Sequence, residues 1–254
     1  MFGAAAGSFL NVCIYRLPKG ESVVFPGSHC GVCAKPVRWH DNVPVLSYFV
    51  LRGRCRDCGA KFSAQYALIE ILTGLLFVLF YRVFGLSGVG AVYLLFTLAL
   101  LTQSMIDFAH KIIPDEITLP GIVLGLVCSS FFPELQNQSS WQAGLLYSAA
   151  GMLAGGGFLY LVAVVAERVM KKEAMGGGDV KLLAMTGAFL GLAGAAWTLF
   201  FGSVIGAVAG IYFKFSKKEE QIPFGPFLGL AAVLYIFFGS AVIDWYFQFL
   251  QARV

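Results

Sequence analysis

Charge is scarce in this 254-residue sequence. Only 13% of the residues are Asp, Glu, Lys or Arg, whereas 58% are hydrophobic and the mean hydropathy is +0.78. This composition excludes an ordinary soluble domain, in which about a quarter of the residues carry charge. Internal repeats and nucleic-acid-binding motifs are also missing, and the net charge of +4 needs no nucleic acid to explain it. We therefore interpret the chain as an all-α polytopic membrane protein surrounded by lipid.

Apolar stretches near the ~20 residues that cross a bilayer recur along the chain, and we count about eight. The first begins at Met1 without the basic leader and small-residue cleavage site of a secretory signal. We treat it as a span, and a native start upstream of Met1 stays open. The predicted spans are residues 2–16, 64–84, 91–108, 115–132, 142–166, 180–196, 198–213 and 224–249.

The positive charges predict the orientation, because cytoplasmic loops keep an excess of Lys and Arg. Of the 18 Lys and Arg residues, all but Arg82 and Arg253 fall in one alternating set of connections. We assign that set to the cytoplasm, so both chain ends are expected outside it. The cytoplasmic set comprises residues 16–61, Lys111, 167–181 and 214–222.

Only residues 17–63 form a soluble segment long enough to fold separately, between a first helix at 1–16 and a membrane core at 64–254. The segment holds two cysteine pairs, Cys30-Gly-Val-Cys33 and Cys55-Arg-Asp-Cys58. Four thiolates with this spacing suit one tetrahedral, structural zinc ion. Two disulfides are the alternative, which a reducing cytoplasm argues against. We predict a small cytoplasmic zinc-binding domain.

Two acidic residues occupy costly positions for a membrane protein. Asp107 closes one apolar stretch, and Asp179 opens another directly after three glycines. Carboxylates beside hydrocarbon usually face a polar cavity or a partner and mark a functional site. With the predicted orientation, both lie at the cytoplasmic leaflet. Two carboxylates that approach each other there cannot both ionise readily, which suits the hydrolysis of peptides by a paired acid and base.

Each aspartate also has a structural interpretation. Asp179 could cap a helix start, where Asp is favoured. Asp107 fits a structural role less well, because an anion is disfavoured at a helix C-terminus. Asp115, with Thr118 three residues later, reads as the N-cap of the next helix.

Several further residues are candidates to support the pair. Glu70 lies in a predicted span and could hydrogen-bond the glycine loop, tune the aspartates or satisfy a polar backbone group. Lys181 could offset the charge of Asp179 or extend to the surface. The glycines at 176 and 178 belong to residues 171–178, which we predict to be a flexible approach to Asp179. Asn11 is predicted to hydrogen-bond to a neighbouring helix.

The motifs resemble those of the type IV prepilin peptidase family, in the same order along the chain. The resemblance implies that Asp107 and Asp179 are catalytic. The family's glycine-x-glycine-aspartate element, which here ends at Asp179, is similar to that of presenilin-type intramembrane proteases. The residues that carry it are Gly7-Ser-Phe-Leu-Asn-Val12 with Arg16-Leu-Pro18, the two cysteine pairs, Ile106-Asp107 through Ile113-Pro-Asp115, Gly176-Gly-Gly-Asp-Val-Lys-Leu-Leu183 and Ile222-Pro-Phe-Gly-Pro226.

The resemblance also implies a substrate, a second activity and a location. Prepilins or pseudopilins would be cut after a Gly, usually before Phe, where the basic leader meets the hydrophobic helix. The new amino terminus would then be methylated from S-adenosylmethionine at the bacterial inner membrane. Since no Gly-rich nucleotide loop follows a strand, the methyl transfer rests on the resemblance alone.

Three other functions compete with this interpretation. A presenilin-like intramembrane protease is the nearest, and the cysteine domain argues against it. An ion-coupled transporter would place its acids near the bilayer midplane between repeated halves. A zinc-ribbon membrane adaptor would leave Asp107 without a role.

Overall fold

The computed structural model describes residues 1–171, 176–217 and 222–251, with the backbone alone at 214–217, 247 and 250. Within these ranges the protein is helical and forms no strand, as the composition predicts. The elements are α1 (Phe2–Arg16), η1 (Leu17–Lys19), η2 (Trp39–Asn42), α2 (Leu46–Val50), α3 (Gln65–Phe84), α4 (Gly88–His110), α5 (Asp115–Phe131), η3 (Pro133–Gln136), α6 (Trp141–Met170), α7 (Gly177–Lys217) and α8 (Gly225–Gln251).

Five helices are long and apolar enough to cross a bilayer, namely α3, α4, α6, α7 and α8. The predicted count of about eight spans is not confirmed. Two of the predicted spans correspond to α1 and α5, which have only 15 and 17 residues. Two others, 180–196 and 198–213, lie within the single element α7.

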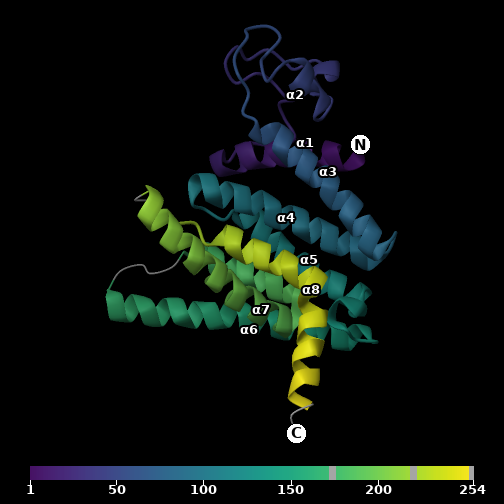
Figure 1. Cartoon of the computed structure of the whole chain (residues 1–254), viewed down its shortest axis with the longest axis vertical. Helices are drawn as coiled ribbons and strands as arrows, with labels where there is room; N and C mark the ends of the chain where they lie inside the picture. Colours follow the sequence, from purple (N-terminus) through teal and green to yellow (C-terminus); the bar gives the residue numbers. More distant parts are fainter. Residues whose placement is uncertain (172–175, 218–221, 252–254) are drawn as a thin grey trace. The chain divides into compact units, whose positions relative to one another are not determined.

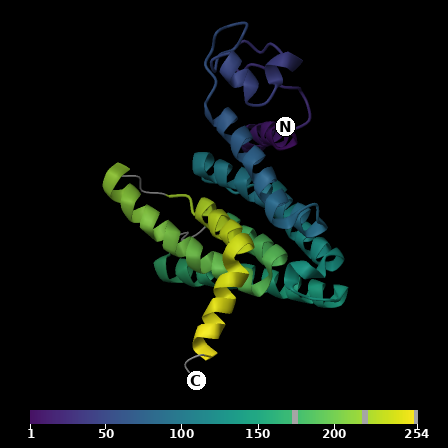
Figure 2. The same cartoon turned by 45° about the vertical axis from the view of Figure 1, so that its right-hand side comes forward.

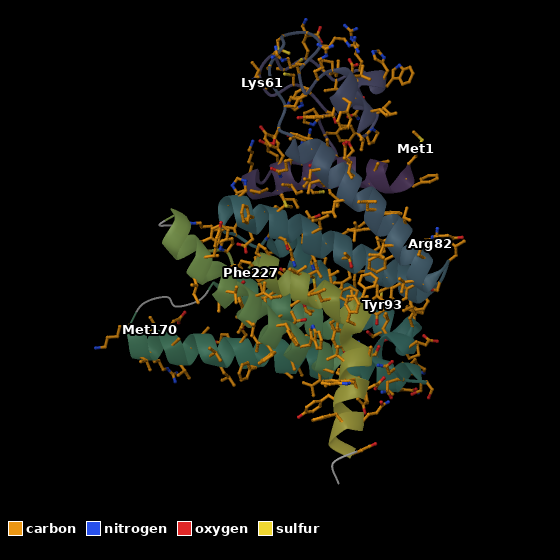
Figure 3. All side chains as sticks on the ribbon, in the orientation of Figure 1. Met1, Lys61, Arg82, Tyr93, Met170 and Phe227 are labelled. Atoms are coloured by element: carbon orange, nitrogen blue, oxygen red, sulfur yellow. The ribbon has the colours of Figure 1, made fainter. Side chains whose placement is uncertain are left out.

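The chain forms two compact units, Met1–Leu94 (unit 1) and Leu95–Val254 (unit 2). In unit 1, α1 packs against α3, and the cysteine-rich loops with α2 lie beyond the start of α3 (Figures 1 and 2). Figure 3 shows Lys61 among these loops and Arg82 near the far end of α3.

Small residues bring α1 and α3 together. A Cβ atom placed on Gly7 would lie 2.7 Å from the Cα of Glu70, and one on Gly3 would lie 2.9 Å from the Cα of Gly74. The predicted interhelical role of Asn11 is confirmed, because its Nδ2 donates to the backbone oxygen of Tyr66 at 3.0 Å. Close approach and a polar bridge are the usual means of helix association in membranes.

In unit 2, α7 packs against α5, α6 and α8 (Figures 1 and 2). Its contact with α6 passes through glycines: a Cβ atom on Gly151 or Gly187 would overlap the backbone of the other helix. Only residues without a side chain allow backbones to approach this closely, so the glycines determine how α6 and α7 pack.

The helix α7 is broken at Gly191, where φ is 68° and ψ is −170°. A break leaves carbonyls of the preceding turn without their helical partners. The carbonyl of Ala188 accepts hydrogen bonds from the side chains of Ser129, Ser148 and Gln136 at 3.2, 2.6 and 3.2 Å. Non-helical backbone is tolerated at membrane depth where protein satisfies it in this way.

Candidate active site

Asp107 lies in the last turn of α4 with only 6% of its surface exposed. Its Oδ2 accepts a hydrogen bond of 2.9 Å from the backbone N–H of Gly225, the first residue of α8. A Cβ atom at position 225 would lie 2.6 Å from the same oxygen, so any residue larger than glycine would displace the carboxylate. Among the described residues Asp107 has no ion-pair partner. A buried carboxylate without a cation is costly, which favours a functional role.

Asp179 is the third residue of α7 and is half-buried. It therefore does not occupy the capping position before the helix, and the capping interpretation is wrong. Its backbone N–H donates to the carbonyl of Gly176 at 3.2 Å, and the positive end of the helix dipole favours its charge. The predicted flexible approach at 171–178 is wrong for Gly177 and Gly178, which belong to α7. Residues 172–175 lie outside the described residues, and there it stays a prediction.

The structure brings the two aspartates together. The carboxylates of Asp107 and Asp179 are close enough for their charges to interact. The side chain of Ile113 lies beside Gly178, which precedes Asp179, and beside Gly225, which hydrogen-bonds Asp107. A Cβ atom on Gly178 would be 2.9 Å from Ile113, and one on Gly225 would be 3.2 Å from it. Sequence reasoning overlooked Ile113, although it belongs to the motif that ends at Asp115.

Asp115 and Lys181 form an ion pair, with Nζ 2.7 and 2.8 Å from the two carboxylate oxygens. Asp115 is the first residue of α5, and its side chain makes no capping hydrogen bond. The N-cap prediction for Asp115 is therefore wrong, because Pro114 occupies that position. The charge of Lys181 is matched by Asp115, and the pair joins the starts of α5 and α7.

Glu70, in unit 1, is 9% exposed. Its Oε2 accepts a hydrogen bond of 2.7 Å from the backbone N–H of Val45. Of the three interpretations of Glu70, the structure supports the one in which it satisfies a polar backbone group.

The four cysteines of the two pairs form one cluster, with all sulfur atoms within 4.8 Å of one another. The Sγ atoms of Cys30 and Cys58 are 3.7 Å apart. A tetrahedral zinc ion with bonds of about 2.3 Å needs sulfur atoms about 3.8 Å apart, so the cluster fits this metal. The other thiols, Cys13 and Cys128, belong to α1 and α5 and lie outside the cluster.

The thiols of the cluster differ in their pKa. Backbone N–H groups of Cys33 and Val32 stabilise the Cys30 thiolate and lower its pKa to about 6. The backbone of Ala60 acts in the same direction on Cys58, but burial and the neighbouring cysteines outweigh it and raise the pKa of Cys58 to about 12. Metal ligation requires the deprotonated form of each thiol.

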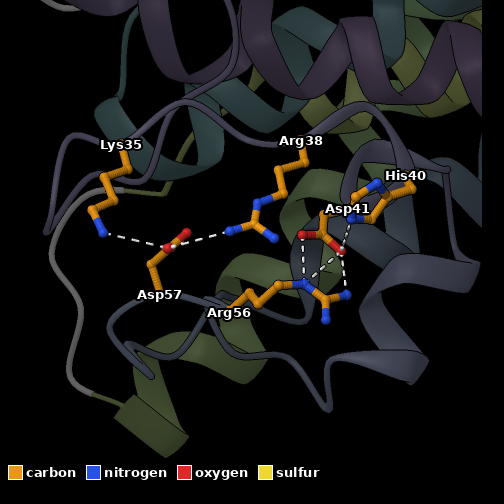
Figure 4. Close-up of polar contacts among 6 residues, drawn as sticks. All are labelled: Lys35, Arg38, His40, Asp41, Arg56 and Asp57. Carbon is orange, nitrogen blue, oxygen red and sulfur yellow. Dashed lines mark hydrogen bonds and ion pairs between the residues drawn. The ribbon is translucent and has the colours of Figure 1, made fainter.

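Ion pairs join the segments that carry the two cysteine pairs (Figure 4). Asp57 pairs with Lys35 at 3.4 Å and with Arg38 at 3.8 Å. Arg56 donates to Asp41 through Nε and Nη2, with Nε at 2.8 Å from Oδ2, and this contact lowers the pKa of Asp41. Each pair connects residues far apart in sequence, which helps to hold the cysteines in place.

Comparisons with known proteins divide the chain at nearly the same place as its two compact units. A family model described as the bacterial peptidase A24 N-terminal domain matches residues 1–84, and the model of the type IV leader peptidase family matches residues 94–211. A prepilin leader peptidase/N-methyltransferase from Xanthomonas campestris is 35% identical, across 99% of this chain and 94% of the relative. The chain belongs to the type IV leader peptidase family. Both aspartates lie in the segment that this family's model matches.

Other family members match over different lengths. A protein of the same name from Stutzerimonas stutzeri is 35% identical across 98% of this chain and 92% of its own length. One from Myxococcus xanthus is 38% identical across 83% of this chain and 61% of its own length. No solved structure matches the chain. Together with its five apolar helices, membership of this family makes the chain a multi-pass membrane protein.

Proposed function

We propose that this protein removes the basic leader from type IV prepilins or pseudopilins and then methylates the new amino terminus. Relatives that align with nearly the whole chain are named for these two activities. The observation that supports the peptidase half is that Asp107 and Asp179, from helices far apart in sequence, lie near enough for their charges to interact.

The two aspartates would act as a general base and a general acid. At short range, two carboxylates favour a state in which they share one proton. The ionised group takes a proton from water, which attacks the scissile carbonyl, and the protonated group donates to the departing amide nitrogen. The N–H of Gly225 holds one oxygen of Asp107 and so orients that carboxylate. No covalent intermediate is needed.

We infer the substrate from the family to which the chain belongs, and the location from that family and from the distribution of Lys and Arg. We infer that cleavage occurs at a Gly–Phe bond on the cytoplasmic side of the bacterial inner membrane. The distribution of Lys and Arg supports a cytoplasmic cysteine domain and extracytoplasmic chain ends. A prepilin with its basic leader in the cytoplasm and its helix in the bilayer would present the scissile bond at that leaflet.

Two cofactors belong to this proposal. Zinc would be structural, held by Cys30, Cys33, Cys55 and Cys58, whose sulfur atoms are close enough to share one ion. When bound, it would stabilise a loop-rich segment too small to bury much apolar surface. S-adenosylmethionine would be the methyl donor, as the N-methyltransferase names of the relatives imply.

The decisive test replaces each aspartate with the neutral amide of the same shape. Asp107→Asn and Asp179→Asn should each lower the rate of leader removal from a purified prepilin about 100-fold or more, because acid–base catalysis contributes roughly 10²–10⁴-fold. Cleavage is followed by mass spectrometry. Asp244→Asn, an exposed acid of the same unit, serves as the control and should cleave normally.

Normal cleavage by either variant would remove that aspartate from the catalytic role. Activity that survives both substitutions and disappears with a chelator would identify a metalloenzyme and overturn the proposal.

A further inference from the structure

The short helix α2 has an exposed apolar face. Its residues Leu46, Phe49 and Val50 are 57, 64 and 74% exposed. They are three and four residues apart, so they share one side of the helix. The other side, with Ser47 and Tyr48, lines a cavity of about 440 Å³ inside unit 1. The helix is therefore amphipathic, and its apolar side points out of the unit.

A cluster of large apolar side chains on a surface usually marks contact with a membrane or with another protein. The position of α2 distinguishes between these two partners. The backbone N–H of Val45, directly before α2, donates to Oε2 of Glu70 at 2.7 Å. Glu70 is the sixth residue of α3, about 7.5 Å along the axis from Gln65 at ~1.5 Å per residue. A glutamate side chain reaches only a few ångströms, so α2 begins level with the first two turns of α3.

These two turns of α3 belong to the bilayer. The helix is one of the five that can cross a membrane, and its 20 residues make it about 30 Å long. This length equals the thickness of the hydrocarbon core, about 30 Å. A helix that is just long enough must begin near the boundary between headgroups and hydrocarbon. The start of α2 therefore lies at that boundary, and not beyond the membrane.

The approach of α2 to α3 is enforced by the surrounding structure. Val45 has φ 65° and ψ −54°, a region that β-branched residues rarely adopt. Strain of this kind persists only where other contacts determine it. Glu70 makes such a contact, because its side chain is largely buried and bonds to the strained residue. The level of α2 is thus a fixed feature of unit 1.

Basic residues follow α2 directly. Arg52 and Arg54 are exposed, and neither forms an ion pair among the described residues. Phospholipid headgroups carry phosphate, which guanidinium groups bind through paired hydrogen bonds. An apolar helix face next to cations is typical of segments that lie in the membrane interface.

We propose that α2 is an interfacial helix, which inserts Leu46, Phe49 and Val50 among the phospholipids and places Arg52 and Arg54 at their phosphates. The helix lies within residues 17–63, which the sequence predicts to be soluble, so the proposal places part of that segment in lipid. Cys55 follows Arg54 directly, and the contact therefore holds the second cysteine pair near the membrane surface. The inference needs α3 as a membrane span and is independent of both proposed activities.

Photo-crosslinking in a bilayer tests this contact. Phe49 is replaced by a benzophenone amino acid in the full-length, zinc-loaded protein, which is reconstituted in nanodiscs of phosphatidylcholine. After illumination, mass spectrometry should find phospholipid attached at position 49, with a yield within threefold of that at Leu75, an exposed residue of α3. Tyr48, on the opposite side of α2, is the matched control, and the same replacement there should give at least tenfold less lipid adduct.

Two results would overturn the proposal. Equal yields at positions 48 and 49 would show that the outward face has no particular contact with lipid. Attachment of a second copy of the chain at position 49, in place of phospholipid, would show that protein covers this face. If the Phe49 variant fails to fold, Val50, on the same side of α2, takes its place with the same expected yields.

Discussion

At the level of single residues, the proposed peptidase site depends on the contact between Gly225 and Asp107. The glycine supplies a backbone donor at 2.9 Å, and its lack of a side chain leaves room for the carboxylate. The same glycine borders Ile113, which also borders Gly178 beside Asp179. Glycines thus leave room for three segments to approach one another around the two acids.

Gly225→Ala is expected to impair cleavage without unfolding the protein. Its Cβ atom would meet Oδ2 of Asp107 and shift the carboxylate, and misplaced catalytic groups lose much of their rate. We expect kcat for leader removal to fall about 10- to 100-fold, with a much smaller change in KM. Steady-state kinetics with a purified prepilin measures both.

Gly210→Ala is the matched control for this substitution. Its Cβ atom would make only an ordinary contact at 3.6 Å with Ile222. Equal kcat values for the two variants would show that Gly225 does not position Asp107.

The broken helix α7 shows how one element is adapted to its position. It has 41 residues, which at ~1.5 Å per residue is about twice the length needed to cross a bilayer. The break at Gly191 divides this length, and Gln136 and two serines satisfy the carbonyls of Ala188 and Phe189 that precede it. The ion pair of Lys181 with Asp115 then joins the first turn of α7 to α5.

Gly191→Ala should destabilise the protein by about 1–3 kcal/mol, because a residue with a side chain is strained at this positive φ. The new Cβ atom would also collide with Oε1 of Gln136. Denaturant unfolding of the protein in mixed micelles, followed by circular dichroism, measures the change in the free energy of unfolding.

Gly157→Ala in α6 is the appropriate comparison. Nothing lies within 4 Å of its Cβ position, and alanine is preferred over glycine in a helix interior. Its free energy of unfolding should therefore stay the same or rise. A Gly191→Ala variant as stable as this control would contradict a required glycine in the break.

The whole molecule divides into two units with different sources of stability. Unit 2 is formed by long apolar helices that pack through glycines. The loops of unit 1 contain only the short helices η1, η2 and α2 between α1 and α3, together with the cysteine cluster and its surrounding ion pairs. We therefore expect a bound metal to contribute to the stability of unit 1.

Replacing Cys30 or Cys55 with serine should release the metal, because a tetrahedral site needs all four thiolates. Bound zinc, measured by elemental analysis of the purified protein, should fall from about one ion per chain to a small fraction of that. Protease should then cut residues 17–63 more rapidly, since their loops would lose their main constraint.

Cys128→Ser, which changes a thiol outside the cluster, should retain both zinc and protease resistance. Stoichiometric zinc in the Cys30 and Cys55 variants would refute the four-thiolate site.

Local patterns in the sequence were enough to predict the helical class, the membrane-spanning character of the chain, and the acids and thiols of the candidate sites. Hydrophobic stretches, the spacing of Cys30 to Cys58 and the placement of Asp107 and Asp179 at helix ends are visible without a structure, because each depends on a short segment. The break in α7 was missed: the prediction divided it near residue 197, whereas Gly191 carries the irregular backbone. One glycine among many in this chain gives no local sign of its φ.

Contacts between distant segments were decided only by the tertiary structure. Gly225 and Asp107 are 118 residues apart, Lys181 and Asp115 are 66 apart, and Val45 and Glu70 are 25 apart. Two of these contacts use a backbone N–H, which every residue except proline possesses, so no side-chain pattern can announce them. The sequence therefore identified the acids and thiols, and the packing of helices decided which partner each of them meets.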